Sequence, residues 1–306
     1  MTSKAGDASP ILSLNENNGD MGGYQLHTGF SLEVGRWHKP QELNEGVDLG
    51  RLDAYQFKLA QSWYLNRDQS LSMILPIGIY QRYDAHQMNR SSGLGDLFVS
   101  MQQRSCRQQI KGNRFCVAAL VGLTIPTGEY AVDQKSTTNM LTAQDNGSFV
   151  INTFNAQTSL GSDTWSVFIG GKVDWRYSSH FHVFTEIGYL LPMTETQDQI
   201  LWGSDLFTKL SVVSHIVDWG GLLLGGSWQN HGYDTVLNIE QEQRRVEVGG
   251  RQTFEIHAGG FVKLNKKTSC EVGVDYTPWA ELNAPQLIKA SSVRLGCLYA
   301  WGTQVN

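Results

Sequence analysis

The sequence predicts an all-β protein, a transmembrane antiparallel up-and-down β-barrel of about 12 strands. Two observations carry this prediction. Apolar and ionisable residues alternate along most of the 306-residue chain, and the links between the alternating segments are mostly short and long in turn. Successive side chains of a strand point to opposite faces, so each segment has an apolar face and an ionisable face. In a membrane-spanning barrel these faces meet the lipid and the lumen respectively.

Segment 165–177 shows the alternation most clearly. Its large apolar residues occupy odd positions, whereas Lys172 and Asp174 occupy even positions. Aromatic residues, Trp202 and Trp301 among them, gather near the segment ends. This is the position of the aromatic girdles that barrels place at the two membrane interfaces.

The composition of the chain agrees with a barrel. Charged residues make up 17% of the chain, and its mean hydropathy is −0.29. No run approaches the roughly 18 apolar residues that a membrane-spanning helix needs. An apolar period of about 3.6 residues is hard to find, which argues against an α/β fold. The net charge of −5 argues against a nucleic-acid partner.

The links between segments assign the two ends of the barrel. We expect strands at 24–35, 55–65, 70–82, 95–106, 115–124, 165–177, 181–191, 205–214, 219–229, 252–263, 269–277 and 291–301. The short links are 66–69, 107–114, 178–180, 215–218 and 264–268, and the long ones are 36–54, 83–94, 192–204, 230–251 and 278–290. Such barrels have short periplasmic turns and longer outer loops, so both termini are expected in the periplasm.

Residues 125–164 break the pattern of links. A strand-like stretch at 148–158 would make the number of strands odd if it crossed the membrane, and single-chain bacterial barrels have even numbers. We therefore expect 125–164 to form one large outer loop with its own hairpin. A barrel of about 14 strands is the alternative.

The predicted domain organisation is a single barrel over 23–306, preceded by a mobile tail or a small lumenal plug at 1–22. Residues 1–13 contain no basic segment followed by an apolar run, so no signal peptide is visible. The expected location is the outer membrane of a Gram-negative bacterium. That location requires that a signal peptide was removed from this chain.

The four cysteines fall into two pairs. Cys106 and Cys116 are symmetric about Lys111 in a short link and share the parity of the ionisable face. They are expected to face each other at ~4.5–5.5 Å between Cα atoms, a distance that a disulfide accepts in the oxidising periplasm. Cys270 and Cys297 share the apolar parity, but their link is long and does not enforce register, so their state stays open. The alternative for both pairs is free thiols that pack as small hydrophobes.

Two short motifs give a more specific indication. SGLGDL at 92–97 opens the fourth expected strand, and GLTIPTGEY at 122–130 closes the fifth. Together they resemble the bacterial outer-membrane family named for the MetA pathway of phenol degradation. That resemblance implies a barrel in the outer membrane and, more weakly, an aromatic or hydrophobic substrate. The C-terminus departs from the usual pattern of outer-membrane barrels, which end on an aromatic residue, because 302–306 follow Trp301 here.

The ionisable parity identifies the candidate lumen residues. They are Lys172, Asp174, Arg176, His182, Glu186, Lys209, Glu255, His257, Glu271, Asp275 and Arg294. Five phenylalanines from different segments share this parity and are expected to line a continuous apolar path: Phe98, Phe168, Phe184, Phe207 and Phe261. The alternative is a lumen closed by paired charges, with Glu186 beside Lys209 and Glu271 beside Arg294, because buried charges need partners.

We therefore expect an outer-membrane channel for the passive uptake of a small solute, with the phenylalanines favouring an aromatic or hydrophobic compound. The alternatives are a structural or interaction barrel that holds a protein partner in the membrane, and a soluble β-sandwich. We expect no enzyme, because no readable spacing places a serine against His257 and Glu255. The scattered histidines and the cysteine spacing argue against a metal site, and no cofactor is expected. The expected partners are membrane lipid and the solute.

Overall fold

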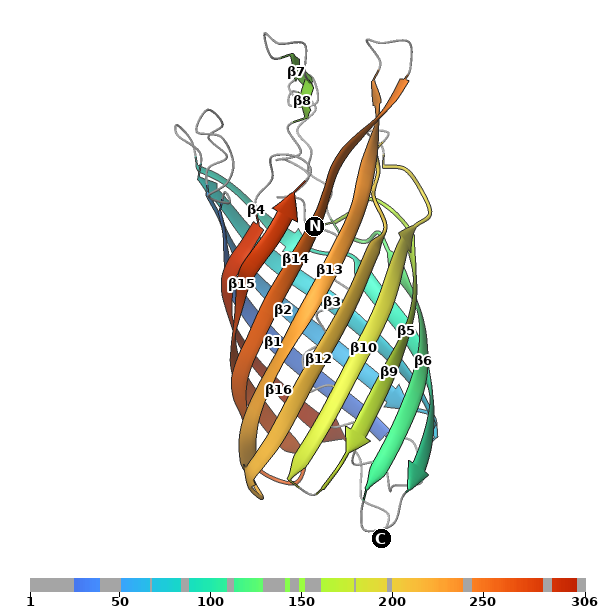
Figure 1. Ribbon diagram of the computed structural model, residues 1–306, viewed down its shortest axis with the longest axis vertical. Coiled ribbons are helices and arrows are strands. Elements are labelled where there is room, and N and C mark those ends of the chain that lie inside the picture. Colours follow the sequence, from blue (N-terminus) through green and yellow to red (C-terminus); the bar gives the residue numbers. More distant parts are fainter. Residues whose placement is uncertain are drawn as a thin grey trace.

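The computed structural model describes residues 25–38, 51–66, 68–83, 88–108, 113–128, 141–143, 149–151, 161–178, 180–196, 200–238, 244–282 and 288–301. In these residues, twelve antiparallel strands form one closed barrel (Figure 1). The predicted number of strands is confirmed. The larger barrel and the two-sheet sandwich are wrong, because a single sheet closes on itself. The tail or plug predicted at 1–22 lies outside the described residues.

The barrel strands are β1 (Gln25–His38), β2 (Arg51–Tyr64), β3 (Gln69–Tyr83), β5 (Leu97–Gln108), β6 (Arg114–Ile125), β9 (Ser166–Arg176), β10 (Phe181–Pro192), β12 (Asp205–Val217), β13 (Gly220–Asn238), β14 (Arg244–Lys263), β15 (Thr268–Leu282) and β16 (Ile288–Trp301). Two short strands extend the ladder, because β4 (Met88–Leu94) pairs with β3 and β11 (Ile200–Leu201) pairs with β13. The predicted outer-loop hairpin is present as β7 (Leu141–Ala143) and β8 (Phe149–Ile151).

The barrel closes between its first and last strands. β1 pairs with both β2 and β16, which places Glu33 opposite Arg294 and Leu26 opposite Trp301. Each barrel strand therefore has a neighbour on both sides, and closure removes the free edges that an open sheet would expose. β1 begins and β16 ends at the end of the barrel where the tight turns lie, such as the turn closed by Leu264 N–H donating to Thr268 O.

Three of the long links predicted from the sequence are wrong in part. In 83–94, residues 88–94 form β4, which pairs with β3. β13 and β14 continue as a paired hairpin to Asn238 and Arg244, so most of 230–251 is strand, and the hairpin stands above the rim (Figure 1). β15 and β16 leave only 283–287 between them, rather than 278–290. Above the membrane both faces of a strand can meet water, so such extensions carry no apolar parity that the sequence could show.

Pro278 also suggested a loop, because proline cannot donate to a β-ladder. It lies inside β15, at an irregularity in the pairing with β14. Phe254 pairs with Trp279 and Ile256 with Tyr276, so the register shifts between them. A bulge of this kind is one of the places in a sheet where proline is tolerated.

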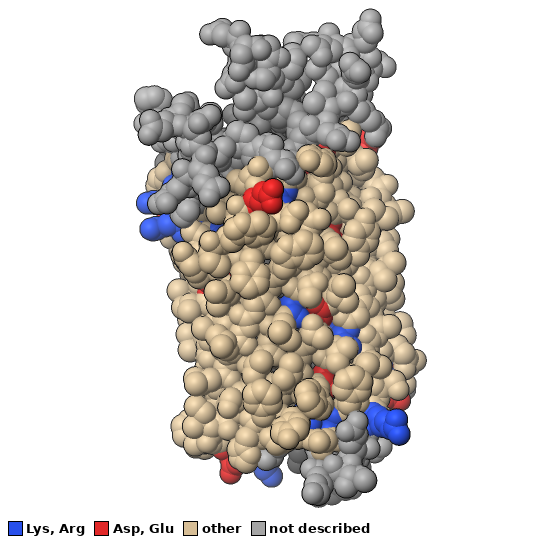
Figure 2. All heavy atoms as spheres, viewed as in Figure 1, with Lys and Arg blue, Asp and Glu red and all other residues tan. Residues whose placement is uncertain are grey.

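The outer face of the barrel is apolar. Ile169, Ile187 and Leu224 are 61%, 54% and 61% exposed. Figure 2 shows few Lys, Arg, Asp or Glu atoms over the middle of the visible face, apart from small patches between the apolar side chains. Exposing this area to water would cost about 25 cal/mol per Å² of apolar surface, so the face is suited to lipid. No helix in the described part of the chain is long and apolar enough to cross a membrane.

Candidate functional site: the barrel lumen

The ionisable residues that the sequence assigned to the lumen lie on the face opposite the exposed apolar band. His182, Lys209, His257, Glu271, Asp275 and Arg294 are buried, and Lys172, Asp174, Arg176, Glu186 and Glu255 are partly buried. Charges at such positions are tolerated when they pair with opposite charges or hydrogen-bond. The pairs divide between two walls of the barrel.

The first wall, formed by β14, β15, β16, β1 and β2, carries a network of ion pairs, and we call it the charged wall. Lys289 Nζ lies 3.4 Å from Glu33 Oε1 and 3.0 Å from Glu255 Oε2. Lys58 Nζ lies 3.8 Å from the other carboxylate oxygen of Glu33. Each of these carboxylates therefore has a lysine partner from a neighbouring part of the wall.

Arg294 and Asp275 form the second part of the charged wall. Arg294 Nη2 lies 3.2 Å from Asp275 Oδ1, and its Nε lies 3.8 Å from Glu271 Oε1. Asp275 also accepts a hydrogen bond from Ser292 Oγ at 2.9 Å and contacts His257 Nδ1 at 2.7 Å. The predicted pairing of Glu271 with Arg294 is therefore one contact within a larger cluster.

The second wall is formed by β5, β6, β9, β10 and β12, and we call it the aromatic wall. Glu186 lies between Lys172 and Lys209 in register, and its Oε2 lies 3.7 Å from Lys172 Nζ. The predicted partner Lys209 is thus its neighbour on one side, and the ion pair with Lys172 lies on the other. His182 pairs with Asp174 on the adjacent strand.

The inward phenylalanines form two clusters. Phe98, Phe168 and Phe207 pack with Leu120 and Leu190, and Phe184 and Phe261 pack with Val213 and Leu223. Phe168 stacks on Phe207 at 5.9 Å between ring centroids and meets Phe98 edge-on at 5.7 Å. Along β10 and β12, Glu186 and Lys209 lie between the two clusters. The continuous apolar path expected from the sequence is therefore interrupted by charged residues.

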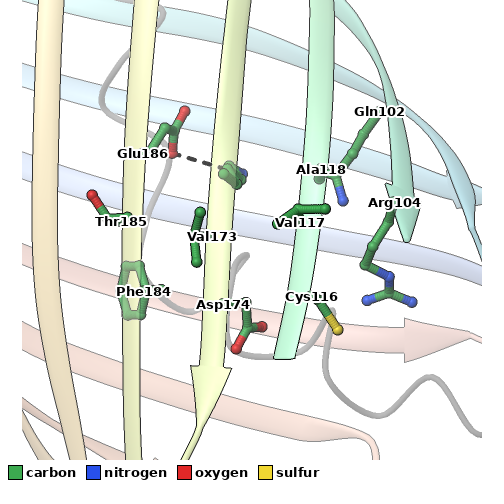
Figure 3. A pocket seen from close by; sticks show the side chains of 11 residues that line it. Gln102, Arg104, Cys116, Val117, Ala118, Val173, Asp174, Phe184, Thr185 and Glu186 are labelled. Carbon is green, nitrogen blue, oxygen red and sulfur yellow. Dashed lines mark ion pairs between the residues drawn. The ribbon is translucent and has the colours of Figure 1, made fainter. Parts of the chain in front are cut away.

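A small pocket with a cavity volume of about 20 Å³ lies beside the aromatic wall (Figure 3). Its lining includes Gln102, Arg104, Cys116, Lys172, Asp174, Phe184 and Glu186. These side chains come from β5, β6, β9 and β10, so the pocket exists only when the four strands are paired. It combines cations, carboxylates and one aromatic ring, which suits a solute with both polar and apolar parts.

The two motifs that carried the family resemblance meet at the outer rim. The carboxylate of Asp96 accepts hydrogen bonds from Gly128 N at 3.1 Å and from Ser162 N and Oγ, both at 2.6 Å. A Cβ on Gly128 would lie 2.6 Å from Gly161 Cα, so the two backbone segments cross closely there. The motifs therefore anchor both ends of the large outer loop on the barrel.

Trp202 belongs to this rim anchor and not to an aromatic girdle. It is 8% exposed, and its Nε1 donates a hydrogen bond to Ser162 O at 2.9 Å. The assignment of Trp202 to a girdle is wrong. A tryptophan near a strand end can lie at the membrane interface or can be buried with its N–H hydrogen-bonded, and the sequence does not distinguish the two. Trp301, by contrast, is exposed.

Three histidines that are scattered in the sequence, His182, His231 and His257, each meet a carboxylate of a neighbouring strand. His231 lies between Asp205 and Asp234, with Nδ1 and Nε2 each 2.9 Å from a carboxylate oxygen. His257 contacts Asp275 in the same manner. Strand pairing creates the contacts with Asp205 and Asp275, so spacing within the chain does not reveal them, whereas Asp234 lies three residues from His231 on the same strand.

Both cysteine pairs form disulfides in the structure. Cys106 opposes Cys116 on the lumen side, and Cys270 opposes Cys297 on the lipid side, with Cα atoms 4.1 Å apart in each pair. Both bridges lie near the end of the tight turns. The second pair has a fixed register because β15 and β16 are longer than predicted and only 283–287 separates them.

Ser227 is a lumen residue that the sequence did not single out, although its side chain contacts a buried histidine. Its Oγ lies 2.9 Å from His257 Nε2, on the side of the ring away from Asp275. A serine carries no charge and is too small to contribute to the apolar alternation. Once β13 and β14 are paired, however, Ser227 and His257 share a face two positions apart in register. Both residues have odd numbers in the adjacent predicted strands 219–229 and 252–263. This shared parity was the only indication in the sequence that their side chains point to the same face.

Comparison with known proteins gives structural likeness alone. No family model matches the chain, so the resemblance to the phenol-degradation family stays a prediction. No curated protein matches it either. The structure is similar to the NanC porin, with a TM-score of 0.47 and 10% identity over 88% of this chain and 98% of that chain.

Two further solved structures are similar to this one to about the same degree. The translocator domain of the autotransporter NalP from Neisseria meningitidis has a TM-score of 0.47 and 10% identity, over 97% of this chain and 96% of that one. The CymD monoaromatic hydrocarbon channel has a TM-score of 0.44 and 8% identity, over 97% and 94%. None of these likenesses carries a functional conclusion for this chain.

Proposed function

We propose that this protein is an outer-membrane channel for the passive uptake of a small solute that combines an aromatic or other apolar group with a polar one. The observation that carries the proposal is the pocket whose lining combines Arg104, Lys172 and Glu186 with the ring of Phe184. It lies inside a closed barrel whose outer face is apolar, and in bacteria such barrels occupy the outer membrane.

The mixed lining of the pocket favours an amphipathic solute. A solute ring placed against Phe184 gains about 25 cal/mol per Å² of apolar area removed from water. The charged side chains beside it offer hydrogen bonds that a hydrocarbon cannot use. Passage also requires that binding be weak enough for release, and a small pocket with one aromatic contact meets that need.

The test is permeation into liposomes that contain the purified full chain. Benzenesulfonate, which stays ionised and crosses lipid slowly, is compared with a sugar of similar size. We expect benzenesulfonate to enter about tenfold faster, as one ring contact worth about 1.4 kcal/mol would give. Phe184→Asp should remove this preference, and Phe184→Leu should keep most of it because the apolar contact remains.

Two outcomes contradict the proposal in different ways. Equal permeation of both solutes would mean a general pore without a solute-selective pocket. Permeation of neither solute, with the barrel folded, would mean a closed interior, and the charge network and phenylalanine clusters would then be packing.

The hairpin of β13 and β14 favours a second candidate, an interaction barrel. The pairing of β12 with β13 ends at Asp205 opposite His231. β13 and β14 continue to pair past this point, from Tyr233 opposite Gly249 to Asn238 opposite Arg244. β11 already occupies the edge of β13 at Thr235 and Val236, so a strand of another protein would add at the edge of β14. Shortening this hairpin separates the candidates: a channel keeps its permeation, whereas an interaction barrel shows none in either form and loses its partner.

A further inference from the structure

Three lumen residues on adjacent strands have the geometry of an acyl-transfer site. Ser227 on β13 lies 2.9 Å, from Oγ to Nε2, from His257 on β14. The other ring nitrogen of His257 lies 2.7 Å from Asp275 Oδ1 on β15. A nucleophile and a base within hydrogen-bond reach, with the base oriented by a third group, is the arrangement that defines such sites on unrelated folds.

The hydrogen bonds fix the direction of proton movement. An ionised carboxylate can only accept, so His257 Nδ1 donates to Asp275. In the neutral ring, Nε2 then carries no proton and accepts the hydroxyl hydrogen of Ser227. Ser292 Oγ, at 2.9 Å, and Arg294 Nη2, at 3.2 Å, donate hydrogen bonds to the Asp275 carboxylate and restrict its orientation. The imidazole is therefore oriented for taking the proton of Ser227.

The three residues differ in exposure as an active site requires, with an accessible nucleophile and a buried base. His257 is 4% exposed and Asp275 is 3% exposed, whereas Ser227 is partly exposed. The nucleophile is thus the most accessible of the three residues, and the base and its orienting carboxylate are buried. A low-dielectric surrounding strengthens the interactions among the three groups.

β12 supplies donors on the other side of Ser227. Lys209 is the register partner of Ser227, and both face the lumen, where opposed Cβ atoms lie ~4.5–5.5 Å apart. Ser211, two residues along, is fully buried, and its Oγ has no hydrogen-bond partner among the described residues. Gly225 pairs in register with Ser211 on one side and with His257 on the other. A Cβ added to Gly225 would lie 2.7 Å from the Ser211 Oγ. The Lys209 side chain on the strand beside Ser227 carries a positive charge, which would stabilise negative charge that develops on a carbonyl oxygen held there. Ser211 is too deeply buried for a solute to reach its hydroxyl.

We infer that Ser227, His257 and Asp275 form a hydrolytic site in the lumen for small carboxylic esters. Ser227 Oγ attacks the ester carbonyl carbon while its proton moves to His257 Nε2. The imidazolium returns that proton to the alkoxy oxygen as the ester C–O bond breaks, which releases the alcohol and leaves an acyl-serine. Water then attacks the acyl-serine by the same proton path, releases the carboxylic acid and restores Ser227. This activity goes beyond the proposed channel and requires only that an ester reach the lumen.

The test is covalent labelling of the full chain in detergent with a fluorophosphonate, followed by peptide mass spectrometry. We expect the label on Ser227, and hydrolysis of p-nitrophenyl acetate that Ser227→Ala removes. His257→Gln should slow labelling about 100-fold or more, as loss of a general base does. Ser62→Ala is the matched control, because Ser62 bonds to Ser72 instead of a histidine and should label and hydrolyse as the unchanged chain does.

A folded barrel whose Ser227 stays unlabelled would overturn the inference. So would equal hydrolysis by the unchanged chain and Ser227→Ala, and the three residues would then be a structural hydrogen-bond chain. Folding is checked for every variant by the heat-dependent migration of barrels on gels. Solute permeation through Ser227→Ala should be unchanged, so failure of the site and failure of the channel are distinguishable.

Discussion

Three inward rings of the aromatic wall, those of Phe98, Phe168 and Phe207, lie against glycines of their own or a neighbouring strand. A Cβ on Gly122 would lie 2.8 Å from Phe98 Cζ, and one on Gly188 would be under 3.0 Å from the rings of both Phe168 and Phe207. These glycines leave the space that the rings fill. The inward glycines and phenylalanines therefore act as pairs, and neither can be exchanged alone without a change in packing.

Gly188→Ala should lower the free energy of unfolding by about 1–3 kcal/mol, because the new methyl group overpacks the cluster that contains Phe168 and Phe207. Urea titration of the barrel in phospholipid vesicles, followed by tryptophan fluorescence, measures this difference. Gly171→Ala is the control on the adjacent strand, since its Cβ would meet nothing closer than Ala118 O at 3.6 Å. A loss at Gly171 as large as the loss at Gly188 would mean that backbone freedom, rather than ring packing, decides the effect.

At the scale of elements, the two disulfides tie neighbouring strands near the turn end, one on each face of the barrel. The bridges close loops of different length, with sequence separations of 10 and 27 residues. In the chain-entropy model a disulfide restricts the unfolded chain more when its loop is longer. The two bridges should therefore differ in how much they stabilise the barrel.

We expect no free thiol in protein isolated without reductant. Cys106→Ser with Cys116→Ser should lower the free energy of unfolding by about 3 kcal/mol, and Cys270→Ser with Cys297→Ser by about 1 kcal/mol more. Both double variants should still fold, because the strand ladder is complete without the bridges. Maleimide labelling of the unreduced native chain at any of these cysteines would contradict the prediction, as would a larger loss from the shorter loop.

At the scale of the whole molecule, the apolar outer face defines the environment in which the barrel is stable. Ile187 is 54% exposed and lies near the middle of β10. Ile187→Arg should cost about 2–4 kcal/mol of unfolding free energy in vesicles, because a charge near the bilayer midplane is poorly solvated. Ile187→Ala keeps the site uncharged and should cost clearly less.

Chemical denaturation of both variants in bilayers of the same lipid gives the comparison. If the two substitutions cost the same, the face that carries Ile187 does not lie in hydrocarbon. A matched substitution on the other face, Glu186→Gln, tests the lumen side, where it should affect the ion pair with Lys172 and not lipid contact.

The sequence by itself determined the faces of the barrel and the number of its strands. Period-two alternation reports which side of a strand meets lipid, and that information is local, so 165–177 alone displays it. The sequence also placed Cys106 against Cys116, because a short turn fixes the register of its two strands. It did not reveal the extension of β13 and β14, since a strand with water on both faces shows no alternation.

The tertiary structure alone decided which inward side chains meet. Register across three strands brings Ser227, His257 and Asp275 together, although His257 lies 30 residues from Ser227 and 18 from Asp275. It also divides the phenylalanines into two clusters and turns Glu186 toward Lys172. The physical reason is that parity assigns a face to a residue but not a height along the barrel, and contact in the lumen depends on both.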